Sequence, residues 1–171
     1  ETEGRKDTPK VTFGIQCVLG GTEEEAKAHQ TEMADRIPID AALNRMSGTM
    51  GVDFSRLELD SRLADNTTEA SQGMLMALAN MAGDGDATVR DAARMFGAST
   101  GMPQVVGTPQ QVADELETLW RSSGCHGFNI TPTTSNRSVE DFVDQVVPLL
   151  QKKGIYRTEY TGKTFAENVM A

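Results

Sequence analysis

The sequence predicts an α/β fold that forms the C-terminal part of a (β/α)8 TIM-type barrel with a helical insertion. Along the 171 residues, a β-rich apolar run followed by a helix occurs at 11–19, 102–106 and 125–130. The connections are short and crossovers between parallel strands are right-handed, so these strands are expected to be neighbours in one parallel sheet. A complete barrel takes about 250 residues. We therefore expect residues 1–171 to hold its last three β/α units.

Composition excludes several classes of function. The net charge of -9 repels nucleic-acid phosphates and anionic lipids, and no apolar run is long enough to span a membrane. Two cysteines, Cys17 and Cys125, make neither a disulfide framework nor a metal site. We expect a cytoplasmic protein with reduced thiols, without a signal peptide, a nucleic-acid partner or a membrane partner. The chain opens on Glu1 and a polar run, which is typical of an internal linker and indicates a fragment.

The first unit begins with the apolar run 11–19, which predicts a buried parallel strand. A helix is expected to follow, because Thr22 and Glu25 have the spacing of a capping box and acidic residues favour a helix N-terminus. This helix is expected to run to about Arg36 and to stop before Pro38.

A helical insertion is expected over about 38–100, between the first and second strands. Within it, 39–50 predicts a short helix that ends at a glycine, and 52–60 alternates weakly, which predicts an extended excursion. A Met- and Ala-rich helix is predicted over 69–81. Thr88 and Asp91, three residues apart, predict the start of another helix, which ends near Gly97.

The second unit carries the strongest local signal in the chain. The strand 102–106 is followed by Thr108 as N-cap, Pro109 in the first turn and Gln111 as capping-box partner. Apolar residues then recur with helical spacing and predict one core-facing stripe: Val112, Leu116, Leu119 and Trp120.

The third unit consists of the strand 125–130 and a long helix. Ser138 and Asp141 predict the start of that helix, and Pro148 is expected to bend or interrupt it. Residues 155–171 are expected to form a C-terminal tail.

Five segments resemble a known family. The segment 107–116 looks like the one that opens the seventh helix of bacterial-luciferase-like flavin-dependent monooxygenases, and 127–130 looks like their eighth strand. The segments 43–59, 141–150 and 154–160 are similar to one branch, which holds the nitrilotriacetate, dibenzothiophene-sulfone and pristinamycin-synthase monooxygenases. The resemblance covers nearly the whole chain, but only the C-terminal portion of the family's barrel.

The resemblance implies a two-component monooxygenase. A separate flavin reductase would supply reduced FMN, which reacts with oxygen to give a C4a-peroxyflavin that oxygenates a small organic substrate. It also implies a homo-oligomer and an N-terminal half of the barrel, on another chain or in the full-length protein, that carries most flavin contacts. Without that half the chain is expected to be inactive, and no catalytic residue is assigned. Two alternatives stay open: a non-catalytic fragment or interaction module without a flavin site, and part of a deazaflavin-dependent oxidoreductase.

Candidate pocket residues come from two strands. Asn129, Thr131 and Pro132 lie at the carboxyl end of the third strand, where barrel active sites form. Gln16 and Cys17 are polar residues within the first strand. The alternative for Asn129 is that it satisfies backbone groups at the strand end, and for Cys17 that it packs as a small hydrophobic residue.

Two further features have a functional and a structural interpretation. His126 has a side chain suited to acid–base chemistry, but it precedes its strand and is expected near the bottom or side of the barrel. The segment 20–22 could bind an anion at a helix N-terminus, although a strand–turn–helix connection requires glycines in any case.

Overall fold

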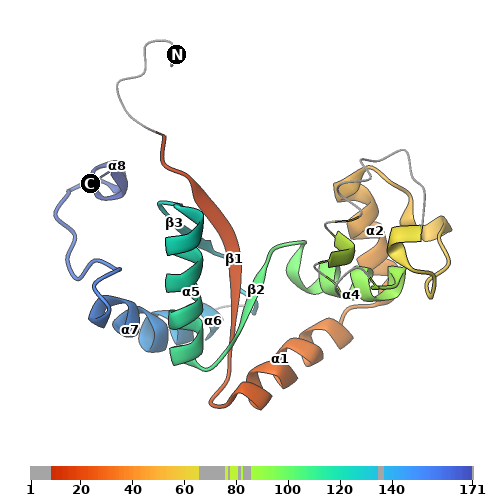
Figure 1. Ribbon diagram of the computed structural model, residues 1–171, viewed down its shortest axis with the longest axis horizontal. Helices are drawn as coiled ribbons and strands as arrows, with labels where there is room; N and C mark the ends of the chain where they lie inside the picture. The colour runs from red at the N-terminus through yellow and green to blue at the C-terminus, as the bar shows by residue number, and fades with distance from the viewer. Residues whose placement is uncertain are drawn as a thin grey trace, which may run out of the picture.

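The computed structural model shows two lobes that helix α1 (Glu23–Asp35) connects (Figure 1). The residues that it describes are 9–65, 76, 78–80, 82, 86–134 and 137–170. One lobe holds the sheet, and the other holds helices α2 (Ile39–Met50) and α4 (Val89–Ser99). None of the helices in these described ranges is long and apolar enough to cross a bilayer.

The sheet is small and parallel, as expected. It contains β1 (Thr12–Leu19), β2 (Gln104–Gly107) and β3 (Gly127–Ile130) in the order β2-β1-β3. The carboxyl half of β1 pairs with β2, and its amino half pairs with β3 on the other edge. The three strands thus lie side by side in one parallel sheet, as expected, with β1 between β2 and β3. β1 has eight residues and its partners four each, so each partner pairs with one half of β1.

The predicted helix starts are found at three threonines. Thr108 and Gln111 form a full capping box at α5 (Pro109–Ser123), and so do Thr88 and its partner at α4. Thr22 caps α1 by accepting a hydrogen bond from the Glu25 backbone N–H at 3.1 Å. The Glu25 carboxylate does not complete a box there. It accepts from the backbone N–H of Gly21 instead, at 2.7 Å.

The insertion differs from its prediction at 52–60. This stretch is not extended, because a 3-10 turn, η1 (Phe54–Arg56), forms there with the Asp53 carboxylate at its start. Phe54 is completely buried in the helical lobe, and this burial favours the turn over an exposed strand. A second 3-10 turn follows as η2 (Leu63–Asp65). Most of the predicted helix 69–81 lies outside the described residues.

The last helix is interrupted, as Pro148 predicted. It consists of α6 (Arg137–Asp141), the π-helical segment η3 (Phe142–Val146) and α7 (Val147–Lys152). Pro148 has no N–H to donate within the helix, and the wider π turn lies directly before it. Ser138 does not cap this helix: its hydroxyl donates to the backbone carbonyl of Thr134 at 2.7 Å.

The segment after α7 ends in α8 (Phe165–Met170), a short helix in the region expected to be a tail. In Figure 1 it lies on the side of the sheet lobe away from the helical lobe. We call 155–169 the tail.

Each lobe has its own hydrophobic core. In the sheet lobe, Ile15 and Cys17 of β1 pack with Val112 and Leu116 of α5 and with Val146 of η3. Odd-numbered residues of β1 therefore define the helix face of the sheet, and even-numbered residues define the opposite face. The core of the helical lobe is built from α2, η1, η2 and α4.

Candidate functional site

The opposite face of the sheet carries a chain of three amide side chains. Gln104 of β2 donates from Nε2 to Oε1 of Gln16 at 2.9 Å, and it accepts from Gln30 of α1 at 2.8 Å. Gln16 is only 4% exposed. With the amides in this orientation, no hydrogen bond from Gln16 Nε2 is found within the part of the chain that the structure describes. A buried amide without its full set of hydrogen-bond partners lowers the free energy of unfolding, so the buried position of Gln16 reduces the stability of the fold.

Asn129 shares this face. It pairs with Gly14 in the sheet, and Gly14 lies two residues before Gln16 on β1. Asn129 is exposed, whereas Gln16 is buried. The structure therefore brings two of the predicted pocket residues to one face, with the small Gly14 between them.

Cys17 lies on the helix face, apart from Gln16. It belongs to the hydrophobic core of the sheet lobe, beside Val105 and Val112. Burial raises the pKa of its thiol to about 12, so the side chain stays neutral at ordinary pH. Cys17 thus packs as a small hydrophobic residue, and it also lines the cavity of about 400 Å³ at the carboxyl end of β1, so its predicted pocket role stays a prediction.

Thr131 and Pro132 continue beyond β3. The Thr131 backbone N–H donates to the carbonyl of Ile15 at 2.9 Å, which prolongs the contact between the two strands. Thr131 is half-buried and Pro132 is exposed. Thr131 and Pro132 therefore follow the carboxyl end of β3, which ends opposite Ile15, whereas β1 continues to Leu19.

A cavity of about 400 Å³ lies at the carboxyl end of β1. Arginines from two elements line it, Arg36 beside α1 and Arg137 in α6. Each is already paired with a carboxylate four residues away: Arg36 with Glu32 at 2.6 Å and Arg137 with Asp141 at 3.7 Å. The cavity therefore does not offer a free guanidinium for the phosphate of a cofactor.

The glycines before α1 have a structural role. A side chain at Gly20 would come within 2.4 Å of the Ala26 backbone nitrogen, so only glycine fits there. At the helix start, the Gly21 and Glu25 backbone N–H groups already donate to Glu25 and Thr22 side chains. These contacts favour the structural interpretation of 20–22 over anion binding.

A larger cavity of about 720 Å³ lies along the whole of β3, and the predicted pocket residue Asn129 is among the residues that line it. His126 lines it and accepts a hydrogen bond at Nδ1 from the Val11 backbone N–H, at 3.1 Å. This histidine fixes the backbone at the end of the sheet opposite to the one where ligands bind in parallel sheets. The cavity is lined by α5, β3 and the tail.

The amide chain contains two residues that sequence reasoning missed. Gln104 could have been predicted, because it is a polar residue within the predicted strand 102–106. It shares a face with Gln16 when the two strands pair with Gln16 opposite Gln104. Gln30 gives no such signal, because a glutamine on a polar helix is ordinary.

No family model matches the chain. Among curated proteins it is 34% identical over 163 residues to nitrilotriacetate monooxygenase component A from Aminobacter aminovorans, covering 94% of this chain and 36% of that protein. It is 34% identical to N-acetyl-S-(2-succino)cysteine monooxygenase from Bacillus subtilis, covering 95% of this chain and 38% of that protein. It is 32% identical to dimethyl-sulfide monooxygenase from Hyphomicrobium sulfonivorans, covering 94% and 34%. The chain thus spans little more than a third of the length of these relatives.

Two solved structures have a fold similar to that of this chain. The crystal structure of DmoA from Hyphomicrobium sulfonivorans aligns with a TM-score of 0.84 at 28% identity, over 94% of this chain and 34% of that one. Riboflavin lyase RcaE, solved with modified FMN and riboflavin, aligns with a TM-score of 0.72 at 27% identity, over 94% and 35%.

Proposed function

Because this chain is homologous to the C-terminal part of the luciferase-like flavin-dependent monooxygenases, we propose that it is one portion of a two-component monooxygenase. The complete protein uses oxygen and reduced FMN from a separate reductase to oxygenate a small organic substrate. One observation carries this proposal: relatives named as monooxygenases match nearly the whole chain at about the same identity, although their names give different substrates.

The proposed place of the chain is the C-terminal portion of a (β/α)8 barrel. Its three β/α units contribute to the barrel, with the helical lobe inserted at about 38–100 and the tail at the end. Supporting this, the sheet is parallel, and α5 and α7 pack on one face of it. Its strand order, β2-β1-β3, differs from the chain order in which consecutive strands of a closed barrel lie. We propose that the face under α5 and α7 is the outer one in a closed barrel, and that the face of Gln16 and Asn129, which Gln30 of α1 also reaches, is the inner one.

We propose that the described residues do not form an FMN site by themselves. Both arginines that line the cavity at the carboxyl end of β1 are paired with carboxylates. At the start of α1, the Glu25 backbone N–H donates to the Thr22 side chain, and the Gly21 N–H before the helix donates to Glu25. When bound, FMN supplies the reducing equivalents for oxygenation. We assign this chain one wall of the interior, to which Asn129 contributes an exposed amide and Gln16 a buried one, and we assign the phosphate contacts to the remainder of the protein.

The test is flavin binding by the complete protein, compared with this chain alone. Oxygen-free titration with reduced FMN, followed by flavin fluorescence, should show binding to the complete protein and none to the chain. A reductase-coupled assay should then show substrate-dependent oxygenation. Failure of the complete protein to bind reduced FMN refutes the proposal. Binding of reduced deazaflavin in its place identifies the oxidoreductase alternative, and binding of neither cofactor favours the interaction module.

A further inference from the structure

Gly14 lies within a strand at a point where the described residues do not require a glycine. It is the third residue of β1, and it is not among the residues with a left-handed backbone. A Cβ atom built on Gly14 would come no closer than 3.4 Å to its nearest neighbour, the Met102 sulfur, which is an ordinary van der Waals contact. Glycine weakens a strand, because it loses the most conformational entropy on folding and packs no side chain. A glycine inside a strand often marks a place where a ligand or another backbone approaches closely.

The position of Gly14 in the sheet is that of a ligand contact. Gly14 is exposed, and Asn129 on β3 is its direct partner. Both lie on the opposite face of the sheet, and Gln16 is the next residue of β1 on that face. β3 ends at Ile130, one residue after Asn129. Gly14 therefore lies beside the carboxyl end of a strand, where parallel sheets bind their ligands.

Two amides beside Gly14 have unused hydrogen-bonding groups. Within the described residues, neither the Asn129 side chain nor Gln16 Nε2 makes a hydrogen bond. Barrel interiors are filled mainly by bulky branched apolar side chains, which cannot pair with an amide. A buried amide without a partner lowers stability. The space in front of Gly14 is therefore better matched by a bound polar molecule than by an apolar side chain from another strand.

The strand positions of this face carry no charged side chain. They are Thr12, Gly14, Gln16 and Val18 of β1, Gln104 and Val106 of β2, and Gly127 and Asn129 of β3. A charged group held against them would lose its hydration without gaining an opposite charge, which is costly. The two free amides can donate hydrogen bonds. They therefore match an uncharged group with an acceptor oxygen or nitrogen.

We propose that Gly14 is a contact residue of the substrate site. The substrate lies directly against the backbone of β1 at Gly14, in the space that a side chain would occupy. The part of the substrate that lies there is uncharged and accepts a hydrogen bond from Asn129, and the Met102 thioether borders it. This inference rests on the proposed function, which gives the flavin phosphate to the remainder of the protein and leaves the substrate for this wall.

Alkylation of the variant Gly14→Cys in the complete protein, without flavin, tests whether the space is open. Neutral iodoacetamide should label the introduced thiol several-fold faster than the one in Ile15→Cys, the matched control at a buried position on the other face, where Ile15 is 3% exposed. Mass spectrometry of the labelled peptides separates these thiols from the buried Cys17 and Cys125. A folded Gly14→Cys protein that resists labelling overturns the inference, because protein atoms then fill the space.

Thermal unfolding of Gly14→Ala provides a second measurement that does not depend on a reactive thiol. An open space predicts a melting temperature equal to or above that of the original protein, since alanine lowers the entropy of the unfolded chain. A melting temperature lower by several degrees overturns the inference, because it shows that the added methyl group meets packed protein atoms.

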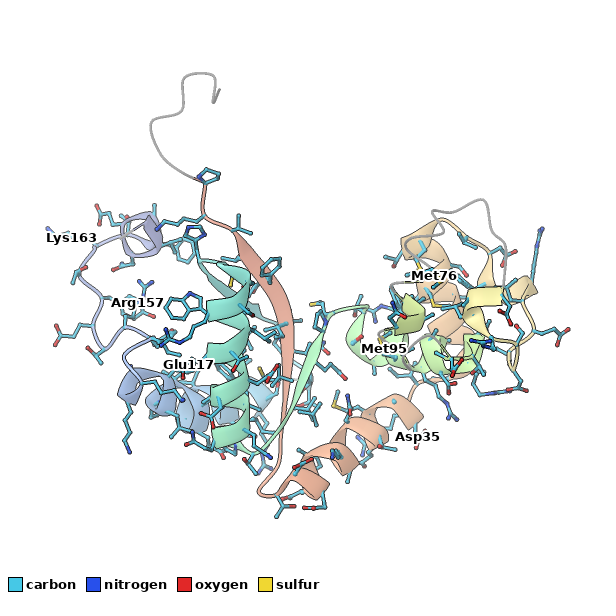
Figure 2. All side chains as sticks on the ribbon, viewed as in Figure 1. Asp35, Met76, Met95, Glu117, Arg157 and Lys163 are labelled. Atoms are coloured by element: carbon cyan, nitrogen blue, oxygen red, sulfur yellow. The ribbon has the colours of Figure 1, made fainter. Side chains whose placement is uncertain are left out.

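The charge preference is tested with iodoacetate, a negatively charged reagent of the same size. The control is Met76→Cys: Met76 is 46% exposed in the helical lobe, away from the sheet (Figure 2). It gives the ratio of the iodoacetamide and iodoacetate rates at an open surface of this acidic protein. The ratio should be several-fold higher at position 14. Equal ratios at both positions overturn the assignment of an uncharged group.

Saturation with reduced FMN, in the absence of oxygen, distinguishes the substrate from the flavin. The thiol at position 14 should still be labelled, whereas complete protection by FMN overturns the assignment to the substrate. The labelling needs no enzyme activity. An open position 14 in a protein that does not bind reduced FMN therefore refutes only the proposed function. A closed position 14 in a protein that binds reduced FMN refutes only this inference.

Discussion

Replacing Gln104 tests whether the amide chain orders the opposite face of the sheet. Gln104→Leu removes the donor to Gln16 Oε1 and the acceptor of the Gln30 amide. Gln16 is 4% exposed, so it cannot recover its lost bond from bulk water. A buried polar group left without a partner costs about 1–3 kcal/mol. For a chain of this size, each kcal/mol lowers the melting temperature by roughly 2–4 °C.

A double-mutant cycle makes this prediction quantitative. Gln16→Leu with Gln104→Leu replaces both partners by apolar groups of similar size, which is expected to be nearly neutral. The double variant should therefore be more stable than the sum of the two single changes predicts. Urea unfolding followed by the fluorescence of Trp120, the single tryptophan, measures all four proteins. Strictly additive changes would refute the reasoning, because they would mean that the two amides do not interact.

Three further predictions concern the cap, the helical core and the thiol. Thr108→Ala removes the N-cap of α5 and should cost about 1 kcal/mol in urea unfolding. Phe54→Ala removes a fully buried ring and should cost about 3–5 kcal/mol, seen as faster deuterium exchange in α2 and α4. Burial raises the pKa of the Cys17 thiol to about 12. The contribution of the neutral thiol to stability is therefore complete at pH values below the pKa of this thiol in the unfolded chain. It is lost as the pH rises through the pKa of the thiol in the folded protein. Alkaline unfolding should therefore begin above about pH 9 and be weaker in Cys17→Ala.

Each of these predictions has a control. Thr118→Ala removes a hydroxyl from the middle of α5, where no N-cap depends on it, and should change stability less than Thr108→Ala does. Phe54→Ala should leave exchange in β1 unchanged, since the two lobes have separate cores, and an equal effect in both lobes contradicts that separation. A Cys17→Ala protein with the same alkaline midpoint as the original would show that other groups cause the loss.

Local chemistry made the helix starts predictable. Thr88 and Thr108 each precede a partner at the spacing that a capping box requires, and this signal needs no distant contact. The order of the strands could not be predicted in the same way, because no local pattern determines which edge of β1 each partner occupies. Phe54 shows the same limit: its burial in the helical lobe decides the local turn.

The candidate site was predictable only as a set of strand positions. Neighbouring residues on a strand point to opposite faces, so Gln16 and Cys17 could not both line one pocket. The sequence does not reveal which face the helices cover, and the packing of α5 on the side of Cys17 decides it. Gln30 joins the site from a distant part of the chain, and no local pattern marks it.

The staggered pairing of β1 has a consequence for the shape of a larger sheet. β2 occupies one edge of β1 from Gln16 to Leu19, and within the described residues the same edge is free beside 12–15. A further strand on that side can bond only with the amino half of β1 and must diverge where β2 begins. The divergence separates the strands at their carboxyl ends, where ligands enter parallel sheets. The four-residue strand β2 thus limits where a further strand can pair on this edge of β1.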